Sequence, residues 1–383
     1  MTQHARSNAA KGFSLLELLL ASALALVVLA GGVGVATGLQ RRSQLEQEVM
    51  SAQVAGRALK EVLASELAGA GAGMKNAQLT FSGLLDQRLA LNVLHEPNLA
   101  SAAGSLFPAD SSFALPPAPY LASDALQLWW SDLDTLLQLT GCFGESVIQP
   151  GGVGACTRTP VNPSWSGVPV MLVNPDLGAG CSVTAHAINA WGFTFQPGMG
   201  NAGATSGLCT TLTDAAWTRA GWRAMRVVGS AWRVNWASGE PVLEYDRPET
   251  PPGDWTAVSR AVERMKVRQA VVDPSTGVRR WFPDPETGRT RALSQCTLLQ
   301  MGAGGECAVP WLVTLPTTDD ALRAELGRQV QELEVTLTLR TRHSASELRV
   351  EGAPPDADEG FPQDGFKRRT FTFRVTPRNF LAP

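Results

Sequence analysis

The most regular hydrophobic pattern in the chain lies near its beginning, where a short polar stretch gives way to a long apolar one. Residues 1–12 are mostly polar, and no charged residue occurs from Leu18 to Leu39. At ~1.5 Å of rise per residue, a helix over this run is long enough to cross the ~30 Å hydrocarbon layer of a bilayer. Glu17 stands at the beginning of the run, where an unpaired carboxylate is costly. The pattern predicts a membrane-spanning helix over 13–39 with one acid at its edge.

The helical pattern continues beyond the membrane-spanning run. Apolar and small residues recur there at steps of three and four, which places them on one face of a helix. Alternating glycines over 69–73 end the pattern, because glycine is a poor helix former. We therefore expect one helix over 13–68, with its second half lying against a soluble domain. The stripe consists of Leu45, Val49, Ala52, Gly56, Leu59, Leu63 and Leu67.

Residues 69–257 form a less regular β region that is rich in Trp, Gly and Pro. Of the eleven tryptophans, nine lie between Trp129 and Trp255. Such residues can stack on a flat ligand, but core and edge positions of a loop-rich β domain are the favoured interpretation. Turn residues separate short apolar runs in this region. These runs predict strands at Ala125–Trp130, Val168–Val173, Gly192–Phe195 and Met225–Val228.

Residues 258–383 alternate more sharply between apolar and polar positions, which is typical of half-buried strands. Two turns with the same placement of Pro and Gly, at 273–277 and 284–288, interrupt the alternation. A short helix is expected to begin near Asp319. The chain thus predicts an α+β fold, in which a long N-terminal helix packs on a largely antiparallel β-sheet domain. The expected strands are Arg260–Val272, Val278–Phe282, Val330–Arg342 and Phe366–Thr376, with an acidic connector over 353–365.

Composition and motifs argue against several classes of function. The chain has 383 residues and a formal net charge of −3, so bulk positive charge does not favour nucleic-acid binding. It contains no HExxH, GxSxG or P-loop motif. Acid pairs such as Asp132 with Asp134, or Asp319 with Asp320, have no histidine at a supporting spacing. We expect a protein that is not an enzyme, with no cofactor, no metal and no nucleic-acid partner.

The six cysteines predict disulfide bonds. An even number in loop-rich sequence is typical of a protein in an oxidising compartment. No CxxC is present and the chain has only four histidines, so a zinc site is not expected. Six cysteines allow 15 connectivities, and pairing between sequence neighbours is favoured. The expected pairs are Cys142–Cys156, Cys181–Cys209 and Cys296–Cys307.

The junction at the start of the apolar run resembles the N-terminus of type IV prepilins. Gly12 is followed by Phe13, three small or apolar residues and Glu17, and the leader before it is basic and contains no acid. The resemblance implies that a membrane prepilin peptidase cuts after Gly12 and methylates the new amine of Phe13. It also implies that Glu17 neutralises the amine of a neighbouring subunit when helices pack side by side in a filament.

Two other interpretations of this N-terminus stay open. An ordinary secretory signal would have ~7–15 apolar residues before a small-residue cleavage site, whereas here apolar chain continues beyond the Ala-Ser-Ala at 21–23. A plain single-span anchor would carry Glu17 by chance. Within the span, Gly34 and Gly38 form a GxxxG pair, which either allows close helix packing or reflects the frequency of glycine in membrane helices.

The C-terminal region is similar to the PilW-type minor pilins. The strand over 330–342, the acidic connector and a last strand leading to Arg378-Asn379 carry this similarity. It implies a minor pilin that initiates pilus assembly near the tip, together with other minor pilins, the major pilin and a tip adhesin. Type IV pili of this kind serve cell adhesion and twitching motility.

The resemblance also implies a location. The protein would sit in the inner membrane as a single-pass protein with a periplasmic C-terminal domain, and in the pilus after assembly. A minor pseudopilin of a type II secretion system would share the same N-terminus. A membrane-anchored periplasmic protein that binds a ligand in its Trp-rich middle region is a third interpretation.

Overall fold

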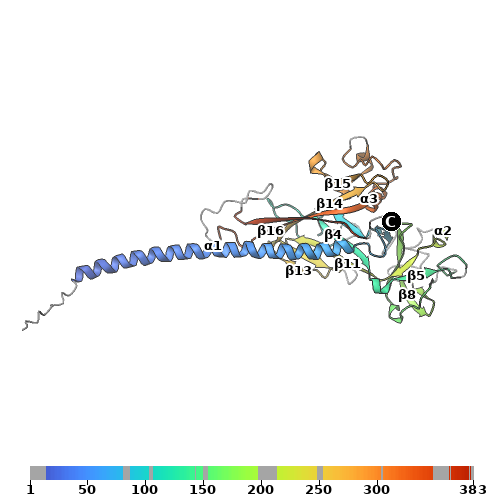
Figure 1. Ribbon diagram of the computed structural model, residues 1–383, viewed down its shortest axis with the longest axis horizontal. Helices are drawn as coiled ribbons and strands as arrows, with labels where there is room; N and C mark the ends of the chain where they lie inside the picture. The colour runs from blue at the N-terminus through green and yellow to red at the C-terminus, as the bar shows by residue number, and fades with distance from the viewer. Residues whose placement is uncertain are drawn as a thin grey trace, which may run out of the picture.

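One long helix dominates the shape of the molecule. α1 (Leu15–Gly69) has 55 residues and ends one residue beyond its predicted end. Its first half projects from the rest of the chain as an isolated rod, and its second half lies along the sheets (Figure 1). The predicted combination of a long N-terminal helix with antiparallel sheets is confirmed. The computed structural model describes residues 14–80, 87–102, 107–142, 144–149, 154–196, 214–247, 253–302, 305–347, 362, 364–378 and 380.

A four-stranded antiparallel sheet from the C-terminal region supports α1. Its strand order is β15-β14-β16-β17, and β16 pairs with β14 on one side and with β17 on the other. The second half of α1 packs on β17 and β16. All four strands predicted for this region are present, with ends shifted by one or two residues. Their bounds are β14 (Val262–Val272), β15 (Arg279–Phe282), β16 (Val330–Arg340) and β17 (Arg368–Val375).

A second antiparallel sheet covers another side of the helix. Its order is β13-β12-β11-β4-β3. The strand predicted at 125–130 is β4. The strand predicted at 225–228 is instead interrupted at Arg226, where β10 (Arg223–Met225) ends and β11 begins, and these two strands belong to different sheets. β13 crosses residue 257, where we placed the division between the two β regions. The bounds are β3 (Leu91–Leu94), β4 (Ala125–Ser131), β11 (Val227–Asn235), β12 (Val242–Asp246) and β13 (Thr256–Ser259).

The remaining strands close into a ring. Strands β8, β7, β10, β5, β6 and β9 follow one another, and β9 also pairs with β8, so the ring has no free edge. β1 joins β8 in parallel and β2 extends the sheet from β1. The bounds are β1 (Gln78–Thr80), β2 (Gln87–Arg88), β5 (Leu137–Thr140), β6 (Gly154–Thr157), β7 (Pro169–Asn174), β8 (Ala179–Asn189), β9 (Gly192–Gln196) and β10 (Arg223–Met225).

Short helices connect the strands. The expected helix near Asp319 is α3, which is capped by the Thr318 hydroxyl and precedes β16. The bounds of the short helices are α2 (Asp214–Trp217), α3 (Asp319–Arg328) and the 3₁₀ helices η1 (Leu133–Thr135), η3 (Pro163–Trp165), η4 (Pro285–Thr287), η5 (Leu293–Gln295) and η6 (Leu298–Met301).

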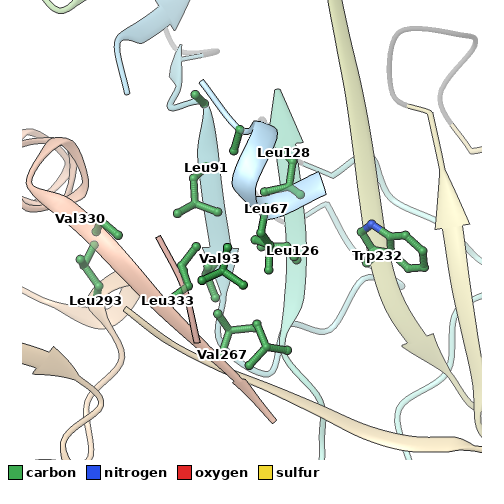
Figure 2. Packing of buried hydrophobic residues seen from close by; sticks show 14 of the residues in the cluster. Leu67, Leu91, Val93, Leu126, Leu128, Trp232, Val267, Leu293, Val330 and Leu333 are labelled. Carbon is green, nitrogen blue, oxygen red and sulfur yellow. The ribbon is translucent and has the colours of Figure 1, made fainter. Parts of the chain in front are cut away.

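The apolar stripe of α1 enters the main hydrophobic core. Every stripe position is buried except Val49, which is half-buried. Figure 2 shows Leu67 against Leu126 and Leu128 of β4, with Val93 of β3 beside them. Residues of β14 and β16 complete the same cluster. The helix, the C-terminal sheet and the five-stranded sheet therefore share one core, and the ring of short strands has a separate one.

Gly56 brings α1 close to the C-terminal sheet. A Cβ added at this position would lie 2.5 Å from Cε2 of the Phe371 ring on β17. A real side chain cannot occupy that space unless the ring or the helix moves. The glycine in the middle of the stripe is thus explained by close approach rather than by backbone flexibility, although glycine weakens the helix itself.

We expect Gly56→Leu to lower the free energy of unfolding by about 1–3 kcal/mol, the usual range for overpacking a close contact. Leucine is a good helix former, so any loss reports packing rather than helix propensity. Gly69→Leu is the matched control, because nothing lies within 4 Å of a Cβ added there. Chemical denaturation of the full chain in detergent measures both. An equal loss in the two variants would contradict the packing explanation.

Candidate functional site

The N-terminus of α1 is closed by a capping box. Ser14, which has extended backbone, accepts a hydrogen bond from the Glu17 N–H at 3.2 Å. In return, Glu17 Oε2 accepts from the Ser14 N–H at 3.0 Å and from its hydroxyl at 3.1 Å. This arrangement satisfies backbone donors that a helix start otherwise leaves unpaired. Glu17 therefore has a partner within its own chain, a role that our sequence reasoning missed. The Ser-x-x-Glu spacing before an apolar run was the signal for it.

The capping box uses only part of the carboxylate. Both hydrogen bonds from Ser14 go to Oε2, and Oε1 of Glu17 has no hydrogen-bond partner among the described residues. The side chain is exposed. An ionised carboxylate has about four lone-pair sites, so it can hold the cap and still accept from a cation outside the chain. Gly12 and Phe13, the two sides of the predicted cut, lie outside the described residues.

The first half of α1, over residues 15–39, is apolar, and the described part of the chain does not cover it. Its most hydrophobic 18-residue window has a mean hydropathy of 2.5, and none of that window is buried, so length and composition suit a membrane span. A core helix of a soluble protein would be covered, and this one is not. Large apolar side chains are exposed along the whole first half, including Leu15, Val28 and Leu39. Such a surface suits a membrane span or a contact with other apolar surfaces.

Gly34 and Gly38 lie within this exposed half. No heavy atom is within 4 Å of a Cβ added at either position. The two glycines therefore have no packing role inside the described chain. Their contribution to helix packing between chains stays a prediction.

A polar network anchors the far end of α1. Oε2 of Glu66 accepts hydrogen bonds from the Ser230 hydroxyl and from Nε1 of Trp232, each at 2.8 Å. Both partners lie on β11. Burial raises the pKa of the Glu66 carboxyl, although the two hydrogen bonds oppose that rise. The helix is thus joined to the five-stranded sheet by a half-buried carboxyl group whose pKa lies above its ordinary value.

Two of the three expected cysteine pairs are at disulfide distance. The Sγ atoms are 2.17 Å apart in Cys142–Cys156 and 2.07 Å apart in Cys296–Cys307. The second pair is buried in the main core and closes the loop before α3. Cys181 is also disulfide-bonded, but Cys209, its expected partner, lies outside the described residues.

The other candidates from the sequence have structural roles. Most tryptophans of the middle region are buried in the cores; Trp191 is the exposed exception, at 66%. Asp319 accepts from the Leu298 N–H at 2.8 Å, and Asp320 pairs with Arg323. In the part of the chain that the structure describes, no group of three or more His, Cys, Asp and Glu residues could hold a metal ion.

The described chain thus offers an exposed apolar helix with a polar start as its most distinctive functional surface. Comparison with known proteins adds no family: no family model, no curated protein and no solved structure matches this chain.

The network at Glu66 predicts a pH dependence. The pKa of Glu66 is raised in the folded state. The contribution of this carboxyl to the free energy of unfolding is therefore present below its ordinary pKa of 4.5 and is lost as the pH rises through its folded-state pKa. Glu66→Gln keeps a neutral acceptor for Ser230 and Trp232 at every pH. We expect the stability of this variant relative to wild type to increase between about pH 4 and about pH 7.

Denaturant titrations at the two pH values check this expectation. Glu61→Gln is the matched control, since Glu61 is exposed on the same helix. Its stability relative to wild type should stay constant. A constant difference for Glu66→Gln as well would show that the buried carboxyl does not respond to pH in the folded state.

Proposed function

We propose that this protein is a minor subunit of a type IV pilus. In this proposal, the apolar half of α1 holds the precursor in the inner membrane with the β domain in the periplasm. A prepilin peptidase removes residues 1–12 and methylates Phe13. The mature helix then joins other minor pilins, the major pilin and a tip adhesin in the complex that initiates assembly. The observation that carries the proposal is the capped, fully exposed apolar helix with Glu17 in its first turn.

The physical argument starts from the exposed helix. It can exist in two surroundings that exclude water, a bilayer before assembly and a bundle of similar helices afterwards. In both, a lone carboxylate is unfavourable unless a cation neutralises it. Cleavage before Phe13 would create such a cation as a new amine, and methylation keeps its charge. The unpaired Oε1 of Glu17 gives the amine of a neighbouring subunit a place to bind.

Burial of the tryptophans supports this function over ligand binding by the middle region. Trp165 and Phe193 pack edge to face, and Trp217 stacks on Trp222, all within the core of the ring. These rings have no free face for a sugar or another flat ligand. The ring of strands is therefore best explained as a rigid body that the helix carries, suited to contacts with neighbouring subunits.

The processing step is tested on the N-terminal peptide. We expect mass spectrometry of the membrane-bound protein to find a chain that begins at a methylated Phe13. Gly12→Leu should leave the leader in place, because the peptidase would no longer accept the residue before the cut. A normally sized product from this variant, or a wild-type protein that begins elsewhere, would contradict the proposal.

The assembly step is tested by separating the charge of Glu17 from its capping role. Glutamine also serves in a capping box, so Glu17→Gln keeps the cap and removes only the charge. We expect normal insertion and cleavage of this variant, but at least about tenfold less of it in sheared pili. Removing one partner of a buried ion pair usually costs ~3–5 kcal/mol, which is more than enough for such a loss.

Ser14→Ala is the matched control for this experiment. It removes the hydroxyl of the cap, at a cost of about 0.5–2 kcal/mol in helix stability, and leaves the carboxylate charged. Incorporation should stay within a few-fold of wild type. If Ser14→Ala reduces incorporation as strongly as Glu17→Gln, Glu17 acts as a helix cap and pairing between subunits is refuted.

A further inference from the structure

A cleft lies between the second half of α1 and the strand ends nearest to the projecting half of the helix. It has a volume of about 420 Å³. Ser51, Ala52 and Ala55 of α1 form one wall, and residues 257–261 form another. β13 and β16 are drawn toward the end of the domain from which α1 projects (Figure 1). The cleft therefore lies at the end of the domain that is nearest to the projecting half of the helix.

Arg340 is the central residue of the cleft. It is only 6% exposed, yet it lines the cavity. Its guanidinium carbon lies 4.3 Å from the ring centre of Phe366, 5.3 Å from that of Trp236 and 5.8 Å from that of Tyr120. This aromatic cage holds the guanidinium by cation–π contacts and limits its freedom. No described residue forms a side-chain hydrogen bond or an ion pair with it.

Two further arginines make the cleft cationic. Arg260 and Arg342 also line it, and both are exposed. Neither has a side-chain hydrogen bond or ion pair among the described residues. Glu48 is the one acid in the lining, and it is already engaged: its Oε1 lies 2.6 Å from Nδ1 of His343, and its Oε2 accepts from the His343 N–H at 3.0 Å. Three guanidinium groups thus remain for an external anion.

The helix sets the height of the cleft above a membrane. Glu48 comes nine residues after Leu39, the last residue of the apolar run, which is ~14 Å along the helix axis. The headgroup region extends ~6 Å beyond the hydrocarbon. Membrane helices tilt by ~20° on average, and arginine side chains extend toward phosphate groups. Arg342 directly precedes His343, the partner of Glu48, so its exposed side chain lies at about this height and approaches the headgroup layer when the helix tilts toward the cleft.

We propose that this cleft binds the phosphate group of an anionic phospholipid, with Arg340 as the fixed donor and Arg260 and Arg342 closing over the headgroup. Guanidinium groups bind phosphate oxygens through two parallel hydrogen bonds, and basic residues beside a membrane span are drawn to anionic headgroups. The bound lipid holds the β domain against the membrane surface. This inference rests on the membrane-inserted state in the proposed function, but it does not depend on assembly into a pilus.

The test uses the full chain in detergent micelles that contain phosphatidylglycerol or phosphatidylcholine. Native mass spectrometry measures the affinity for the first lipid bound. Wild type should bind phosphatidylglycerol more tightly than phosphatidylcholine. Arg340→Gln and Arg342→Gln should each weaken the binding of phosphatidylglycerol by about tenfold to hundredfold, the range for one hydrogen bond to a charged group.

One control variant and two features of the design make the result specific. Arg57→Gln removes an exposed arginine from the same helix outside the cleft and should bind phosphatidylglycerol like wild type. Arg342→Gln changes an exposed side chain, so it tests the site even if Arg340→Gln fails to fold. Arg41 and Arg42, which directly follow the apolar run, are present in every variant, so their contribution is constant.

Several outcomes would overturn the proposal. Equal affinity for the two lipids would exclude recognition of the anionic headgroup. Unchanged affinity in a correctly folded Arg342→Gln would exclude the cleft. Displacement of the lipid by millimolar inorganic phosphate would identify a site for a free anion instead. Glu17→Gln should keep the lipid preference, so failure of pilus assembly and failure of lipid binding are separate results.

Discussion

The exclusion of water from the first half of α1 is the constraint on which the rest of the structure depends. Every large apolar side chain from Leu15 to Leu39 is exposed in the isolated chain. At about 25 cal/mol per Å² of apolar surface, leaving such a helix in water is strongly unfavourable. Length and composition suit this half of the helix to a membrane span, and on the proposed function a bundle of similar helices replaces the lipid after assembly. Polar residues flank the apolar run, with Ser14 and Glu17 at one end and Arg41 and Arg42 at the other.

The second half of the same helix connects the apolar half to the β domain. Its stripe enters the main core, Gly56 allows close approach to β17, and Glu66 joins it to β11. A force or displacement applied to the apolar half therefore acts on two sheets at once rather than through a flexible linker. The ring of short strands stands further from the helix, with its own core. The sheets that hold the helix and the ring of strands are thus built on different hydrophobic clusters.

The sequence was sufficient to predict those elements whose hydrophobic pattern is local. The helix, the stripe and the C-terminal strands have periods that extend over ten residues or more, and their ends were predicted to within a few residues. The middle region was different. Strands such as β10 and β6 have only three or four residues, and they pair with partners far away along the chain. Ring closure depends on these distant pairings, which a local pattern does not contain. The aromatic cage of Arg340 was missed for the same reason, since Tyr120, Trp236 and Phe366 come from distant segments.

On the proposed function, Glu17 serves first the single chain and then the assembly. In the single chain, Oε2 of Glu17 accepts the hydrogen bonds of the capping box, which stabilises the first turn of α1. A capping box of this kind also fixes the side chain against the helix, so that Oε1 has a defined direction before any neighbour arrives. A carboxylate held in this way loses less conformational entropy when it pairs with a cation from another chain than a freely rotating side chain would lose. On the proposed function, the cap therefore orients the carboxylate toward the amine of a neighbour, and the charge of Glu17 contributes more to the pairing than the cap does.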